Sequence, residues 1–154
     1  MKVGIVYDTV SPMKLTAKVA EAISEVLKEK GIEVDSFLSK DVDRGTIKSF
    51  DCIIAGSPTM YFRASSGIMK FLSSFSNDEF SGKLGAAFGT QLQSRMSGSA
   101  AEGIEKKLAK LGFKTIAPPL TAYVEGKMNE MQLKQGELEK TKNWAEEVAK
   151  TLTK

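Results

Sequence analysis

The sequence predicts an α/β protein with a three-layer, doubly wound parallel sheet of five strands. Short apolar segments rich in β-branched residues alternate along the chain with segments whose apolar residues recur every three or four positions. Several of the apolar segments are continuous, which is typical of strands that helices cover on both faces. Regular strand–helix alternation implies right-handed crossovers between parallel strands. With 154 residues and 42% hydrophobic composition, we expect one domain over residues 1–154.

The first half of the chain supplies three predicted strands. Residues 3–7 form a continuous apolar run and are predicted to be the first strand. The helix that follows is predicted to end at Gly31, a residue suited to the left-handed backbone after a helix. Residues 32–38 alternate as a second strand, residues 41–50 read as a turn of helix and loop, and residues 51–56 are a buried strand. The apolar face of the first helix carries Leu15, Val19, Ile23, Val26 and Leu27.

The second half continues the alternation. A helix is predicted over residues 68–75 and a buried strand over residues 83–89. A loop rich in Ser, Gly and Gln leads to a helix that is predicted to close at Gly112. The last strand is expected within residues 114–124, interrupted by two prolines. The last two helices have apolar faces that carry Ile104, Leu108 and Leu111, and Trp144, Val148 and Leu152.

Composition excludes several classes of function. The chain has no histidine, which removes the commonest general base and zinc ligand, and no metal site is predicted. Its one cysteine, Cys52, is predicted to be a small buried side chain in a strand. A single cysteine can form no internal disulfide, which fits a reducing compartment. The net charge of +3 comes from interspersed Lys and Glu on helical segments, without the basic stripe and interleaved aromatics of a nucleic-acid surface. Neither a signal peptide nor an apolar run of about 20 residues is present, so we expect a cytoplasmic protein without membrane insertion.

In doubly wound sheets, ligands bind beyond the carboxyl ends of the strands where the strand order reverses. The segment after the first strand, residues 8–16, contains no glycine. This absence excludes both the dinucleotide-binding fingerprint and the phosphate loop of nucleotide triphosphatases. A receiver domain would have an aspartate at the end of the third strand, where this chain has Gly56 and Ser57.

The first loop offers hydroxyl groups and one cation at the start of a helix. Ser11 followed by Pro12 is typical of an N-cap and the first helical position, and Thr9, Lys14 and Thr16 lie around it. Free backbone N–H groups and the helix dipole at such a position suit a phosphate monoester. A simple helix cap at Ser11 explains the same residues, and the segment alone leaves both interpretations open.

Two further loops complete the pattern. Tyr61 and Phe62 lie in a polar loop of small residues after the third strand, and aromatics in such a loop suggest a planar ligand on which they stack. The loop after the fourth strand supplies amide and hydroxyl groups suited to the polar edge of a heterocycle: Thr90, Gln91, Gln93, Ser94 and Ser97. The three loops together indicate a flat aromatic ligand that carries a phosphate.

With these residues in view, the chain resembles the flavodoxin family, including the flavodoxin domains of flavo-diiron proteins and the related flavin quinone reductases. The most specific segment is IIAGSPT, residues 53–59, followed by Tyr61 and Phe62. The resemblance implies a flavodoxin-like fold and FMN, with the phosphate on the first loop, the ring against the second and the ring edge against the third. The residues that it assigns to the cofactor are Thr9, Val10, Ser11, Lys14, Leu15, Thr16, Pro58, Thr59, Met60, Tyr61, Phe62, Arg63, Thr90, Gln91 and Ser97.

Three functions fit this sequence. The first is an FMN-binding electron-transfer protein, in which the protein orients the flavin and tunes it electrostatically. The second is a flavin-dependent NAD(P)H:quinone reductase of the same fold, and the third is a flavin-free interaction module that kept the fold. We expect a redox partner protein or a small quinone-type acceptor for the first two.

The first loop departs from the family pattern. It is about two residues longer than is usual in the family and lacks the family's Gly and Asn.

Overall fold

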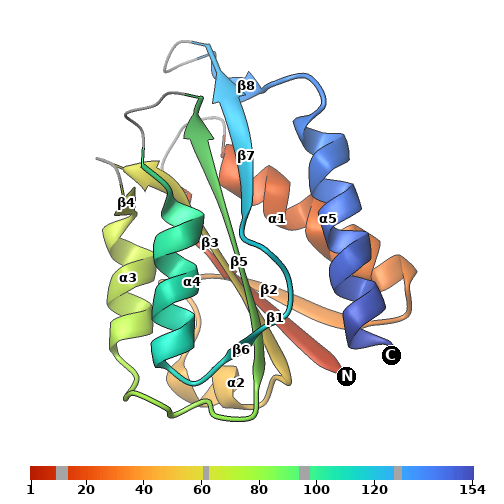
Figure 1. The fold of residues 1–154 in the computed structure, drawn as a ribbon. Coiled ribbons are helices and arrows are strands. Elements are labelled where there is room, and N and C mark those ends of the chain that lie inside the picture. The colour runs from red at the N-terminus through yellow and green to blue at the C-terminus, as the bar shows by residue number, and fades with distance from the viewer. Residues whose placement is uncertain (10–13, 61–62, 94–97, 127–129) are drawn as a thin grey trace.

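The computed structural model describes residues 1–9, 14–60, 63–93, 98–126 and 130–154. Within these ranges the predicted α/β fold is confirmed. Five strands lie side by side in the order β2 (Glu33–Leu38), β1 (Lys2–Tyr7), β3 (Cys52–Met60), β5 (Leu84–Leu92) and β7 (Leu120–Glu125), all parallel. The arrowheads of β5 and β7 point to the same edge of the sheet, at the top of Figure 1.

Helices cover both faces of this sheet, which makes three layers (Figure 1). Helices α1 (Leu15–Glu29) and α5 (Glu137–Leu152) lie on one face, and α3 (Ser66–Ser73) and α4 (Ala100–Lys110) lie on the other. The short helix α2 (Arg44–Lys48) falls within the segment that the sequence marks as a turn of helix and loop. Among the helices that the structure describes, none is both long enough and apolar enough to cross a membrane.

Burial on both faces explains the continuous apolar runs. In β3, Ile54 packs into the core under α1 and α5, while its neighbours Ile53 and Ala55 pack into the core under α3 and α4. Successive side chains of a strand point to opposite faces, so every position needs an apolar residue when both faces are covered. The helices end as predicted at Gly31 and Gly112, which have φ angles of 82° and 99°.

Three differences from the predicted elements bear on the candidate site. The described helix α1 begins at Leu15, with Lys14 as its N-cap, whereas the sequence predicts a helix start at Ser11 and Pro12, which lie outside the described residues. Strands β3 and β5 run to Met60 and Leu92, beyond the predicted ends at 56 and 89. They continue because β3 and β5 remain paired as far as residues 58 and 90, and β3 then pairs with β4 (Arg63–Ala64).

Two other short strands complete the sheet. The last predicted strand is split into β6 (Lys114–Thr115) and β7, both paired with β5, and the two prolines lie between them. Strand β8 (Gln132–Leu133) pairs antiparallel with the end of β7. The side chain of Trp144 on α5 donates a hydrogen bond of 2.7 Å from Nε1 to the carbonyl oxygen of Pro118, which ties the split strand to the last helix.

Candidate functional site

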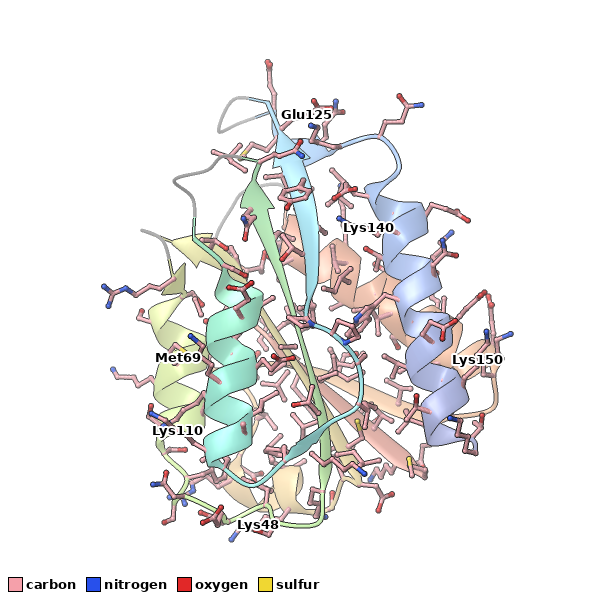
Figure 2. The ribbon with its side chains drawn as sticks, viewed as in Figure 1. Lys48, Met69, Lys110, Glu125, Lys140 and Lys150 are labelled. Atoms are coloured by element: carbon pink, nitrogen blue, oxygen red, sulfur yellow. The ribbon has the colours of Figure 1, made fainter. Side chains whose placement is uncertain are left out.

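The candidate site lies at the carboxyl edge of the sheet, where β1 and β3 are neighbours although β2 lies between them in the chain. The chain runs outward from this point in both directions, which makes it the topological switch point of the sheet. Figure 2 labels Glu125 at this edge and Lys48 at the opposite one. The loops after β1, β3 and β5 all leave from the carboxyl edge.

The first loop presents one hydroxyl group without a partner. The Oγ1 atom of Thr9 is buried and has no hydrogen-bond partner among the described residues. A buried hydroxyl without a partner is costly, so this atom is suited to receive a ligand. Lys14 is exposed, with a left-handed backbone (φ 50°, ψ 46°), and no side chain caps the helix that starts after it. Val10 and Ser11 lie outside the described residues.

The two remaining first-loop residues face inward. Leu15 and Thr16 are 5% and 2% exposed. The Thr16 hydroxyl lies 2.8 Å from that of Thr90, which is itself 4% exposed at the end of β5. The structure therefore brings two predicted site residues together and places their contact beneath the first and third loops.

The second loop is a hairpin that continues β3 into β4. Thr59 pairs with Ala64 and Met60 pairs with Arg63 in antiparallel register. Pro58 and Thr59 are half-buried and Arg63 is exposed. Tyr61 and Phe62, the aromatics predicted to stack on a planar ligand, lie outside the described residues, between Met60 and Arg63 in the chain.

Thr59 connects the second loop to the third. Its Oγ1 donates to Oε1 of Gln91 at 3.3 Å and accepts from the backbone N–H of Ala100, the first residue of α4, at 3.1 Å. Gln93, also proposed for a polar ligand edge, is exposed and its Oε1 accepts from Nζ of Lys134. Ser94 and Ser97 lie outside the described residues.

Asp8 is a residue of this edge that was not among the predicted site residues. It accepts hydrogen bonds from the side chains of Ser39 and Ser65 and from the backbone N–H of Ile68. The signal that could have revealed it is a carboxylate directly after a buried strand, at the edge where ligands bind. In contrast, among the described residues no three His, Cys, Asp or Glu side chains are grouped to hold a metal ion.

Comparison with known proteins gives the family. The family model described as flavodoxin matches residues 10–144 of this chain. The chain belongs to the flavodoxin family. A flavodoxin from Clostridium saccharobutylicum is 37% identical over 91 residues, which are 58% of this chain and 56% of that protein.

Solved structures agree on the flavodoxin fold. An archaeal flavodoxin is 26% identical, covers 100% of both chains and superposes with a TM-score of 0.79. The rubredoxin:oxygen oxidoreductase of Desulfovibrio gigas is 24% identical, with a TM-score of 0.80 over 99% of this chain but only 36% of its own. A Fusobacterium nucleatum flavodoxin bound to flavin mononucleotide is 20% identical, with a TM-score of 0.73 over 97% of both chains. The chain thus spans about a third of the oxidoreductase and just over half of the clostridial relative.

Proposed function

We propose that this protein binds one FMN at the carboxyl edge of its sheet and transfers electrons through it. The observation that carries the proposal is the unpartnered Thr9 hydroxyl directly after β1, at the switch point of a flavodoxin-family sheet. The exposed Lys14 at the start of α1 belongs to the same first loop. The family binds flavin, and a hydroxyl with an ammonium group at a helix start is a donor set that suits a phosphate.

The remaining loops would hold the other parts of the cofactor. The hairpin from Pro58 to Arg63 would lie against the ring, with Tyr61 as the stacking residue and Phe62 as the substitute if the register differs by one. Gln91, held by the Thr59 hydroxyl, would contact the polar edge of the ring, together with Ser97. Val10, Ser11 and Met60 belong to the same proposed lining.

Flavin supplies the redox chemistry, because its ring exchanges one or two electrons, while the protein supplies binding, orientation and electrostatics. The chain's own residues then have three tasks. Lys14 and the start of α1 balance the phosphate charge, the second loop orients the ring, and exposed Arg63 biases the potential. A redox partner protein or a small quinone-type acceptor would exchange electrons with the bound ring.

The proposal is tested by titrating the purified apoprotein with FMN and with riboflavin, monitored by flavin fluorescence and visible absorption. We expect one FMN per chain and weaker binding of riboflavin, which lacks the phosphate. Equal affinity for the two flavins would remove the phosphate site, and no binding of either would leave a flavin-free interaction module.

A second experiment tests the ring face. Tyr61→Ala and Phe62→Ala are compared, and the stacking residue should lose about 0.5–1.5 kcal/mol of binding free energy beyond lost burial. Unchanged affinity and unchanged fluorescence quenching in both variants would show that neither aromatic stacks on the flavin.

A further inference from the structure

Asp8 joins three elements that are far apart in the sequence. Its Oδ1 accepts a hydrogen bond from the Ser39 side chain, which follows β2, and its Oδ2 accepts one from the Ser65 side chain, which precedes α3. Oδ2 also accepts the backbone N–H of Ile68 at 2.6 Å. The Asp8 carboxylate, directly after β1, therefore connects the start of the first loop to the residues that follow the second loop.

The Asp8 carboxylate caps the N-terminus of α3, although it lies far from α3 in the sequence. Ser65 is the N-cap of α3, yet its side chain makes no capping hydrogen bond to the helix. Asp8 instead accepts the N–H of Ile68, the third residue of α3, which is the group that an N-cap side chain ordinarily satisfies. A negative charge at a helix N-terminus is also favoured by the helix dipole.

Gly67 makes this approach possible. A Cβ atom on Gly67 would lie 2.5 Å from Oδ2 of Asp8 and 3.0 Å from its Cγ and Oδ1. Such contacts are far shorter than van der Waals separation, so a side chain at residue 67 would displace the carboxylate.

Ser65 is anchored from a second direction. Its backbone N–H donates to Oγ of the fully buried Ser57 at 3.2 Å. Ser57 and Ser65 flank the β3–β4 hairpin, whose two strands are closed by the pairs Thr59 with Ala64 and Met60 with Arg63. Both ends of the ring-facing hairpin are thus fixed, one of them through Asp8.

We infer that Asp8 is a positioning residue, which holds the ring-facing hairpin in place relative to the first loop. The inference rests on the proposed FMN site. The Asp8 link acts on the part of the site that faces the ring, and the phosphate is served by Thr9 and Lys14. Loss of the link should therefore weaken the binding of FMN and of riboflavin by the same factor, whereas a change at the phosphate site weakens the binding of FMN alone.

The experiment compares Ser65→Ala with Ser39→Ala. Each variant removes one hydroxyl donor from the same carboxylate, but only Ser65 adjoins the ring-facing hairpin. Because Ser65→Ala removes a hydrogen bond to a charged group at the end of the hairpin, we expect it to weaken the binding of both flavins roughly 10-fold, which is about 1.4 kcal/mol, and to change the fluorescence quenching of the bound flavin. Ser39→Ala should lower the free energy of unfolding by about as much as Ser65→Ala does. Its flavin affinity should stay within about twofold of wild type.

Two variants of Asp8 complete the test. Asp8→Ala should reproduce the loss seen in Ser65→Ala, and the double variant should lose no more than either alone, because both remove one link. Asp8→Asn keeps an oxygen that can accept at α3 and an amide that can donate to Ser39, so it should restore most of the flavin affinity. The midpoint potential of flavin bound to Asp8→Asn would separate the effect of the Asp8 charge from the effect of its hydrogen bonds.

The two possible failures are distinguishable. If wild type binds FMN but Ser65→Ala shows wild-type affinity and quenching, or matches Ser39→Ala in both, Asp8 has only a structural role and the inference is wrong. If wild type binds neither flavin, the proposed function itself fails.

Discussion

The hydroxyl oxygens of Thr16 and Thr90 lie 2.8 Å apart in a buried contact between the first turn of α1 and the end of β5. Either hydroxyl can be the donor, and both side chains are nearly inaccessible to solvent. This hydrogen bond fixes the start of the helix that follows the first loop against the strand that leads into the third. This pair of threonines therefore links two candidate cofactor loops.

Replacing one threonine of the pair should be worse than replacing both. Thr16→Val leaves the Thr90 hydroxyl buried without a partner, and we expect a loss of about 1–3 kcal/mol in the free energy of unfolding. The double variant Thr16→Val with Thr90→Val removes both polar groups and should recover part of the loss. Urea unfolding of the flavin-free protein measures the cycle, and additive losses would contradict the coupling.

Lys14 should distinguish FMN from riboflavin. Lys14 has a positive φ of 50°, which glycine adopts without strain, so Lys14→Gly removes the ammonium group without the backbone penalty that alanine would carry. We expect a loss of about 1.5–3 kcal/mol in FMN binding and almost none in riboflavin binding. Lys18→Ala, an exposed cation one turn along α1, is the matched control. Equal losses for the two flavins would mean that Lys14 does not serve the phosphate.

Cys52 should make stability fall at high pH. Burial, with a smaller contribution from the charge of Asp51, raises the pKa of the Cys52 thiol from 9.0 to about 12. The stabilisation that this represents is fully present below pH 9 and is lost as pH rises toward 12, because the unfolded chain releases the proton first. The stability advantage of wild type over Cys52→Ala should therefore shrink by about 1.4 kcal/mol between pH 8 and pH 10. Chemical denaturation at the two pH values measures it, and a constant difference would show that the thiol is accessible to water.

Arg63 should raise the reduction potential of bound flavin. Its side chain is exposed on β4, directly after the proposed stacking residues, and nearby positive charge favours negative charge on the reduced ring. Arg63→Ala should lower the midpoint potential, and the difference should diminish at 1 M salt, where the screening length is about 3 Å. Arg95, the second arginine in the predicted ring-facing loops, lies outside the described residues. A potential unaffected by Arg63→Ala at low salt would show that the guanidinium is screened by water.

The holoprotein should accept electrons from a reductase but react slowly with NADH or NADPH alone. The first loop lacks the glycine fingerprint for a nicotinamide nucleotide, and hydride transfer requires the nicotinamide to stack on the flavin. Anaerobic stopped-flow mixing at sub-millimolar nucleotide tests this. Complete bleaching of the flavin within seconds, together with a tetramer in solution, would instead favour the quinone reductase.

The sequence by itself determined the fold of this protein, because helical and strand periodicities differ and both faces of the sheet are buried. Residues 3–7 and 83–89 have the continuous apolar pattern of central strands, and Gly31 and Gly112 mark helix ends with a left-handed backbone. The sequence also predicted where a candidate site would lie, since parallel strands place their carboxyl ends at one edge.

Only the tertiary structure decided which residues of the site touch. Residues 8 and 65, or 16 and 90, are far apart in the chain, and no local pattern records a hydrogen bond between distant loops. Local sequence likewise does not record that the first turn of α1, which begins at Leu15, is bonded to the end of β5 through Thr16 and Thr90. Local propensity describes one segment at a time, whereas the Asp8 carboxylate became a helix cap only when β1 and α3 were folded against each other.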